Sequence, residues 1–361
     1  MLKHALKRYT IIEKMPNFQN IPFEDITSFG QKTLLGTKLF TVSWILARFC
    51  NYNCSYCWPY ARGSTPDHQD LAVYTNTIDE IKRQARENGF TDFHFSFSGG
   101  EPTAYKYFGK VIDHYCSDTA PEYQSIHMTT NLSPGSKWWN NWLEATSSLQ
   151  RRSITASYHA EFANEQEFGD KCLQLMKAGV YVTINQVMVP EMFEELYERL
   201  QRFAARGINV TVKPQSDPTA SRVVSGYTKE QLNLLQTGFP QRIPDEFKKI
   251  IPLLQVELQD KDGKIYYVDQ AERFNAFGFN KFKGWNCNAG YQGCVVRENE
   301  VKRSYSCHDE PLGTLDGGFE LFKAPRKCIT PTCVSSADSK LPKVKYESWN
   351  TRCVILDGCY S

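Results

Sequence analysis

Short apolar runs alternate with longer amphipathic segments between residues 38 and about 215. The short runs, rich in β-branched and aromatic residues, predict strands at Phe40–Ala47, Asp92–Ser98, Ser125–Thr130, Ser153–Tyr158, Tyr181–Val189 and Asn209–Lys213. The longer segments predict helices at Leu71–Asn88, Tyr105–Cys116, Ser136–Thr146, Glu165–Ala178 and Met192–Arg206. A further helix is expected at Thr228–Gln236, after the alternation stops at Pro214.

Strands that alternate with helices indicate parallel strands joined by right-handed crossovers. Six such units are too few to close an eight-stranded barrel, so the expected fold class is α/β, with a partial (β/α)6 TIM-like barrel over residues 38–220. Residues 1–37 form an N-terminal extension and residues 221–284 a connector. Residues 285–361, rich in Gly, Pro and Cys, predict a small Cys-rich C-terminal domain. Chemistry is expected beyond the carboxyl ends of the barrel strands.

Composition places the chain among soluble globular proteins. It has 361 residues, 41% hydrophobic and 23% charged, which excludes disordered and fibrous classes. Its 42 basic and 40 acidic residues balance, so no nucleic-acid partner is expected. No apolar stretch reaches the about 18 residues that cross a membrane. The basic N-terminus lacks the apolar region of a secretory signal, so a cytoplasmic location is expected.

Twelve cysteines are unusual for a chain in a reducing compartment, where thiols more often bind metals or catalyse than form disulfides. Three of them lie together at Cys50, Cys54 and Cys57, and Cys116 and Cys172 stand alone in helical segments. The other seven are Cys287, Cys294, Cys307, Cys328, Cys333, Cys353 and Cys359. This distribution predicts two separate metal regions.

The first cysteine group has the spacing Cys50-x3-Cys54-x2-Cys57 and follows the first predicted strand. Three thiolates can bind three irons of a [4Fe–4S] cluster and leave the fourth iron without a protein ligand. Zinc is the alternative, but a structural zinc site needs four ligands and no neighbouring His or Cys supplies the fourth. The second predicted strand ends in Gly99-Gly100-Glu101-Pro102, which by itself could be an ordinary turn.

Together the two motifs resemble those of the radical SAM superfamily, in which an aromatic residue such as Tyr56 precedes the third cysteine. The resemblance implies that the open iron chelates S-adenosylmethionine, and that Glu101 and the glycine backbone face its methionine amino group. The implied cofactor-binding residues are Tyr56, Gly99, Gly100, Glu101, Pro102, Thr130, Asn131 and Ser157.

The fourth predicted strand departs from the family pattern. Many relatives have Ser-x-Asp-Gly where this chain has Ser157-Tyr158-His159-Ala160. The third of these positions faces the barrel mouth, so we predict that His159 is catalytic, binding substrate or transferring a proton. Glu161 is a second candidate, and a hydrogen-bonded structural histidine is the alternative. His94, which lies inside a predicted strand, is expected to be structural.

The C-terminal cysteines resemble the SPASM/twitch type of auxiliary cluster domain. Residues that match its pattern in order are Cys287, Gly290, Cys307, Leu312, Gly313, Cys328 and Cys333. The resemblance implies that the four cysteines of this set bind an auxiliary [4Fe–4S] cluster, with zinc as the alternative. The dense later cysteine run of the full SPASM form is missing, which favours the smaller twitch form. Cys294, Cys353 and Cys359 are left over; they could bind a second auxiliary cluster, replace one of the four ligands, or be free thiols.

The resemblance implies a radical SAM oxidoreductase. A reduced cluster would cleave S-adenosylmethionine, and the resulting 5′-deoxyadenosyl radical would take a hydrogen atom from the substrate. An auxiliary cluster favours net oxidation or bond formation, and a flavodoxin or ferredoxin is the expected electron donor. Only 39 residues precede the first strand, too few for a winged-helix peptide-recognition domain, which favours a small molecule such as a sugar, nucleotide or amino-acid derivative. The alternatives are a maturase of a ribosomally made peptide or protein and, remotely, a non-enzymatic iron–sulfur electron carrier.

Overall fold

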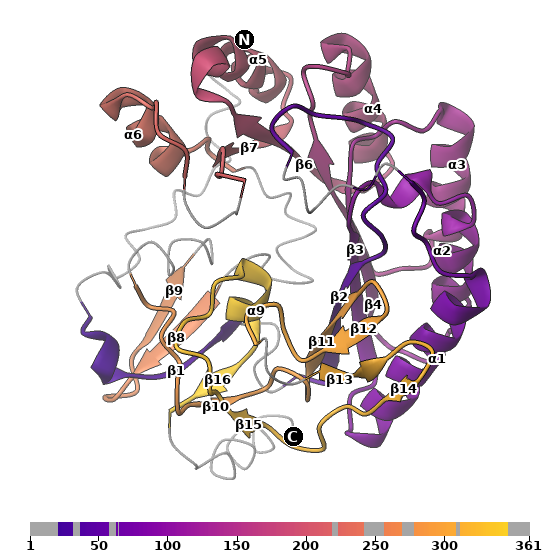
Figure 1. The fold of residues 1–361 in the computed structure, drawn as a ribbon, viewed down its shortest axis with the longest axis vertical. Helices are drawn as coiled ribbons and strands as arrows, with labels where there is room; N and C mark the ends of the chain where they lie inside the picture. The colour runs from indigo at the N-terminus through magenta and orange to yellow at the C-terminus, as the bar shows by residue number, and fades with distance from the viewer. Residues whose placement is uncertain are drawn as a thin grey trace.

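The computed structural model describes residues 21–31, 37–57, 63, 65–218, 223–241, 256–268, 278–307 and 311–345. The strands of these residues form a ten-stranded and a six-stranded sheet (Figure 1). None of the described helices is both long and apolar enough to cross a membrane.

The centre of the larger sheet is a run of six parallel strands in sequence order. They are β2 (Leu39–Ile45), β3 (Asp92–Ser98), β4 (Gln124–Thr130), β5 (Arg151–Ser157), β6 (Tyr181–Met188) and β7 (Asn209–Pro214). The helices between and after them are α1 (Leu71–Glu87), α2 (Phe108–Ser117), α3 (Ser136–Ala145), α4 (Glu165–Lys177), α5 (Phe193–Ala205) and α6 (Lys229–Thr237). This confirms the predicted α/β partial barrel, with every predicted strand and helix present.

Each barrel strand has one face under the helices and one face turned inward. On β3, Phe93, Phe95 and Phe97 are fully buried; the ring of Phe95 contacts Tyr115 of α2, and the ring of Phe97 contacts Phe108 of α2. The intervening residues of the strand are polar and only partly buried. Because side chains alternate along a strand, the apolar outer face forms the core, and the polar side chains of the inner face are partly buried.

The C-terminal segment extends the barrel sheet, an arrangement that the sequence analysis did not predict. Strand β11 (Gly293–Arg297) pairs in parallel with β2. The added antiparallel strands are β12 (Glu300–Lys302), β13 (Pro311–Thr314) and β14 (Gly318–Phe319). Gly293 is needed at this junction, since a Cβ there would lie 2.6 Å from Thr41 Oγ1.

The six-stranded sheet combines segments that are far apart in sequence. Its strands are β1 (Ile26–Gln31), β8 (Val256–Asp260), β9 (Ile265–Val268), β10 (Asn286–Cys287), β15 (Arg326–Lys327) and β16 (Lys343–Val344). Phe29, Leu258 and Phe282 belong to its own buried core. The sheet and the short helix α9 (Ser336–Lys340) lie across the larger sheet from α1–α4 (Figure 1).

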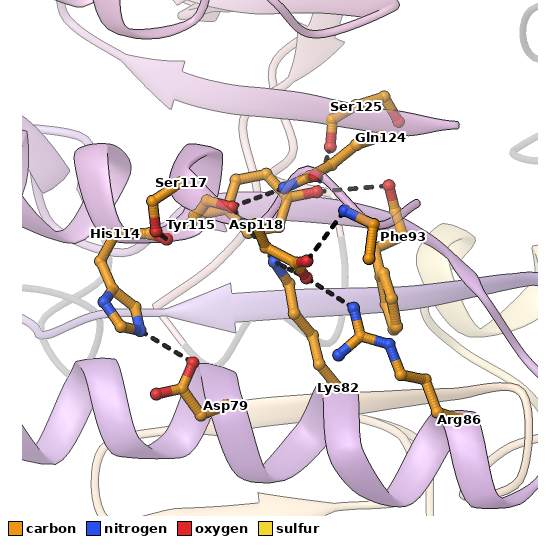
Figure 2. A network of polar contacts seen from close by, with 11 residues as sticks. Asp79, Lys82, Arg86, Phe93, His114, Tyr115, Ser117, Asp118, Gln124 and Ser125 are labelled. Carbon is orange, nitrogen blue, oxygen red and sulfur yellow. Dashed lines mark hydrogen bonds and ion pairs between the residues drawn. The ribbon is translucent and has the colours of Figure 1, made fainter. Parts of the chain in front are cut away.

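A buried lysine fastens α1 to the neighbouring helix and strand (Figure 2). Lys82 Nζ donates to Tyr115 O at 3.1 Å and pairs with Asp118 at 3.0 Å, and Arg86 pairs with the same carboxylate at 2.6 Å. The Tyr115 hydroxyl donates in turn to Ser125 O of β4 at 2.9 Å. This network fixes the helix layer on the amino-terminal ends of β3 and β4, at the opposite edge of the sheet from the candidate site.

Candidate functional site

The predicted barrel-site residues follow the carboxyl ends of adjacent strands. The cysteine loop, residues 46–57, follows β2, and the Gly99–Pro102 motif follows β3. Thr130 and Ser157 are the last residues of β4 and β5. Because these strands are parallel neighbours, the structure brings the predicted residues to one edge of the sheet.

The two glycines pack directly against the cysteine loop. Gly99 has φ +136°, and a Cβ there would lie 2.5 Å from Ala47 O. A Cβ on Gly100 would lie 2.0 Å from Phe49 O. The Gly100 and Glu101 amides donate to Ala47 O and Phe49 O, both at 2.9 Å. These contacts require glycine, so the motif is more than an ordinary turn.

Glu101 connects β3 to the end of β4. Its buried carboxylate accepts hydrogen bonds from Thr130 Oγ1 at 2.7 Å, Asn131 N at 2.6 Å and Thr103 Oγ1 at 2.6 Å. Burial raises the pKa of this carboxyl, and the hydrogen bonds oppose that shift. The Glu101 side chain also caps the short 3-10 helix Pro102–Ala104, in which Pro102 is buried. Three predicted cofactor residues therefore form one hydrogen-bonded unit.

The cysteine loop is tied to its surroundings on two sides. Asn131 Nδ2 donates to Asn51 Oδ1 at 2.9 Å. Asp67 accepts from Arg48 N and Phe49 N, both at 3.0 Å, at the start of the loop. The sequence analysis did not identify Asp67, and no motif surrounds it that would have pointed to it.

The three cysteines of the loop lie close enough together for their charges to interact. The Cys57 amide donates to Cys54 O at 3.1 Å, and the Tyr52 amide donates to Cys50 Sγ at 3.4 Å. Burial, together with nearby Glu161, Cys50 and Cys57, raises the pKa of Cys54 to about 12. Without a cation the Cys54 thiol would stay protonated at neutral pH, whereas a metal would bind it as a thiolate.

His159 and Glu161, which we predicted to act on substrate, both lie against the cysteine loop. His159 Nδ1 is 2.8 Å from Tyr56 OH and 3.2 Å from Cys54 Sγ, and the two rings stack. Burial lowers the pKa of His159 to about 4. Glu161 accepts from Ser55 Oγ at 2.5 Å and Ser55 N at 3.0 Å. Both side chains therefore support the loop, and their action on substrate stays a prediction.

A second group of cysteines lies in the C-terminal segment. Cys287, Cys307, Cys328 and Cys333, the four predicted auxiliary ligands, line one small pocket. Cys287 belongs to β10, Cys328 directly follows β15, and the other two lie in loops. Burial raises the pKa of Cys333 to about 11 and raises that of Cys328.

The other cysteines lie apart from this pocket or outside the described residues. Cys294 is buried in β11 and belongs to the barrel core. Cys116 is partly buried in α2, and Cys172 is buried in α4. Cys353 and Cys359 lie outside the described residues.

A buried lysine and a buried aspartate also line the cysteine pocket. Lys343 is 1% exposed, and its Nζ donates to Asp338 O at 2.7 Å and Leu341 O at 2.8 Å. The Asp338 carboxylate accepts from Ser306 N and Ser306 Oγ, both at 2.7 Å. Neither residue belongs to a motif, so only the folded arrangement identifies them.

Neither cysteine group has the geometry of a single-ion site. In the described ranges, no three or more His, Cys, Asp or Glu side chains form a group that could hold a metal ion. An iron–sulfur cluster binds each thiolate through a different iron, so its ligands stand farther apart than those of one ion. The soft sulfur donors of both groups suit such a cluster.

Comparison with known proteins agrees with this geometry. Residues 44–214 match the family model described as Radical SAM superfamily, and these residues span β2 to β7. No curated protein matches the chain.

Among solved structures, native anSMEcpe with bound AdoMet is 15% identical, with a TM-score of 0.50 over 77% of this chain and 78% of that chain. BtrN in complex with AdoMet and 2-DOIA is 14% identical, with a TM-score of 0.31 over 59% of this chain and 85% of that chain. The similarity between this chain and anSMEcpe is a similarity of fold. The sequence similarity to the radical SAM superfamily thus covers residues 44–214, a little under half of this chain.

Proposed function

We propose that the protein is a radical SAM enzyme that binds a [4Fe–4S] cluster through Cys50, Cys54 and Cys57. The observation that carries the proposal is the packing of Gly99 and Gly100 on the cysteine loop, with hydrogen bonds of 2.9 Å to Ala47 O and Phe49 O. An electron carrier would need the cysteines alone. An enzyme also needs a second backbone segment against the cluster loop, where a small cofactor can be held.

The residues around this edge have distinct proposed roles. When bound, the cluster and S-adenosylmethionine would supply a 5′-deoxyadenosyl radical that abstracts hydrogen from the substrate. The proposed cofactor contacts are Tyr56, Gly99, Gly100, Glu101, Pro102, Thr130, Asn131 and Ser157. Glu101 holds the ends of β3 and β4 together, which fixes the positions of these contacts.

His159 and Glu161 are proposed as positioning residues. A cysteine that binds iron can only accept a hydrogen bond, and the side chains placed to donate to Cys54 Sγ are those of His159, through Nδ1, and Tyr56. Hydrogen bonds to cluster sulfurs change the reduction potential. Glu161 fixes the loop between the second and third cysteines through Ser55.

We also propose that Cys287, Cys307, Cys328 and Cys333 bind one auxiliary [4Fe–4S] cluster in a twitch-type arrangement. Four thiolates carry a large negative charge, and the buried Lys343 ammonium in the same pocket offsets part of it. Zinc, the alternative, would require the four thiols to move together, because they form no single-ion group among the described residues. The expected outcome is net oxidation of a small polar substrate, with a flavodoxin or ferredoxin as electron donor and a peptide as the alternative substrate.

The test is cleavage of S-adenosylmethionine by the anaerobically reconstituted, reduced full-length protein. Wild type should form 5′-deoxyadenosine and hold about eight irons in two clusters. The triple Cys50→Ala, Cys54→Ala, Cys57→Ala variant should form none and hold about four. Cys116→Ala, which removes a thiol of α2 outside both groups, should behave as wild type. Formation of 5′-deoxyadenosine by the triple variant would refute the proposal.

A further inference from the structure

A basic and aromatic surface lies at the start of α2, shortly after the Gly99–Pro102 motif. Its residues are Lys106, Tyr107 and Lys110, all of them exposed. The ammonium groups of Lys106 and Lys110 lie 4.6 Å and 5.4 Å from the centre of the Tyr107 ring. Neither lysine takes part in an ion pair of the described residues. This basic surface therefore brings two cations to one exposed ring.

The charge of the basic surface favours a negatively charged partner. Its two ammonium groups repel each other, and the amino-terminal end of α2 adds partial positive charge. Among the nearby carboxylates, Asp67 accepts from amides of the cysteine loop, and Asp70 lies near the Tyr105 hydroxyl. Asp113 is three residues beyond Lys110 on α2. An acidic partner would replace the repulsion between the lysines with attraction.

The basic surface continues into a groove of about 240 Å³ between α2 and α3. These helices lie side by side on the outside of the barrel (Figure 1). Both lysines line the groove, together with Asp113 and the rings of Trp138 and Trp142. Aromatic residues are enriched at protein interfaces, and charges around them steer the partner into place.

A series of aromatic rings connects the basic surface to the cysteine loop. Tyr107 contacts Tyr105 edge-to-face, with ring centroids 5.8 Å apart. Tyr105 stacks on His68 at 4.7 Å, and His68 contacts Phe49 at 6.0 Å. Phe49 directly precedes Cys50. Only a few side chains thus separate this exposed surface from the loop that would bind the cluster.

We propose that the basic surface and its groove dock a small acidic electron-transfer protein, of the flavodoxin or ferredoxin type, that reduces the cluster of the cysteine loop. The donor loses one electron and the oxidised cluster gains it, and no covalent bond forms or breaks. A contact of limited size suits this role, because electron-transfer complexes are transient and bury less than about 1,200 Å². That the partner supplies an electron rests on the proposed function. That an acidic protein binds here does not.

The binding test is calorimetric titration of the reconstituted full-length protein with FMN-loaded flavodoxin and separately with a [2Fe–2S] ferredoxin, both of net negative charge. Wild type should bind at least one of them, more weakly at about 300 mM than at about 50 mM salt. Lys106→Gln combined with Lys110→Gln should weaken this binding at least about tenfold at the lower salt. The control combines Lys177→Gln with Lys229→Gln, the same change of net charge at exposed positions of α4 and α6, and should bind as wild type.

A second measurement follows reduction of the cluster without S-adenosylmethionine. Reduction by flavodoxin hydroquinone should be slower in the Lys106→Gln, Lys110→Gln variant than in wild type. Reduction by dithionite, a small ion that needs no docking surface, should stay within about twofold of the wild-type rate.

Melting curves confirm that each variant is folded. A wild type that binds neither protein, a Lys106→Gln, Lys110→Gln variant that binds as wild type, or equal losses in that variant and the control would each overturn the proposal. Formation of 5′-deoxyadenosine by dithionite-reduced wild type is measured on the same preparation. Cleavage without selective docking refutes the docking surface alone, and selective docking without cleavage refutes the proposed function alone.

Discussion

At the residue scale, the candidate cofactor edge depends on close backbone contacts at a few positions. Gly100 and Glu101 donate from consecutive amides to carbonyls of the cysteine loop, and the Glu101 carboxylate then binds the end of β4. A change at either position affects two strand ends and the loop at once. Single substitutions here should therefore alter the site more than their size suggests.

Gly100→Ala is expected to displace the cysteine loop. The new Cβ would lie 2.0 Å from Phe49 O and 2.4 Å from Arg48 O, both of them backbone atoms that cannot move independently. The reconstituted variant should lose most of its loop-bound iron and of its 5′-deoxyadenosine formation. Iron content, 5′-deoxyadenosine yield and a melting curve measure the effect.

Gly109→Ala is the matched control, because nothing lies within 4 Å of the Cβ it adds in α2. Alanine is a better helix former than glycine, so this variant should gain about 0.5–1 kcal/mol of stability and keep wild-type iron. A Gly100→Ala protein with wild-type iron and cleavage would show that the close packing is dispensable.

His127 should make the stability depend on pH. Its pKa is about 3 in the folded protein and about 6.5 in the unfolded chain, so below pH 6.5 the unfolded state binds the extra proton. The stabilisation is complete above about pH 6.5 and is lost progressively toward pH 3. Between pH 7 and pH 5 this one group should lower the free energy of unfolding by about 2 kcal/mol.

His127→Asn removes that contribution, so urea unfolding at pH 7 and pH 5 should show a smaller difference than in wild type. An unchanged pH dependence in a folded His127→Asn protein would contradict the burial of a neutral imidazole at this position.

At the element scale, α1 connects the barrel to the C-terminal segment. Gln84 donates to Phe319 O at 2.8 Å and accepts from Leu321 N at 2.7 Å, and Asn88 donates to Phe322 O at 2.8 Å. Lys82, on the same buried face, connects the helix to α2 (Figure 2). The helix thus joins three parts of the molecule through polar groups as well as its apolar residues.

Lys82→Met should lower the free energy of unfolding by about 1–2 kcal/mol, because it removes the donor to Tyr115 O and one partner of Asp118. The loss stays moderate since Arg86 still pairs with Asp118 and Gln124 Nε2 still donates to Tyr115 O. Urea denaturation measures the difference. Lys110→Met, an exposed change on α2, should be within about 0.5 kcal/mol of wild type. Equal effects of the two substitutions would contradict the anchoring role.

At the scale of the whole molecule, the elements that the sequence predicted are those that depend on local patterns of apolar and polar residues. The strands and helices of the barrel were predicted within a few residues, because Phe93, Phe95 and Phe97 alternate with polar residues on a buried face. The GGEP motif and the first cysteine group were found from spacing. Strands β1, β8 and β11 were not predicted, because they are short and their partners are distant, as with Ser28 and Gln259. No local pattern records such a pairing.

The same limit applies to the site. The four cysteines that line the C-terminal pocket were predicted from their pattern, and their role as cluster ligands stays a prediction. Lys343 and Asp338 beside them were not predicted, since each is a single charged residue whose burial depends on the tertiary fold. His159 was predicted as a site residue, and that role stays a prediction; its contact with Cys54 depends on how two loops meet and was not predicted.

The assembly of distant segments around the cysteine pocket can be tested with two buried cysteines of the C-terminal segment. Cys307 lines the pocket, whereas Cys294 lies in the barrel core, so the substitutions Cys307→Ala and Cys294→Ala remove similar thiols from different places. Cys307→Ala should lose about four irons yet still form 5′-deoxyadenosine, because the loop cluster keeps its own ligands. Cys294→Ala should retain about eight irons. Melting curves must accompany the iron assays, because loss of a structural metal can unfold the surrounding segment. If Cys294→Ala lost as much iron as Cys307→Ala in folded proteins, the four-cysteine pocket would not be the auxiliary site.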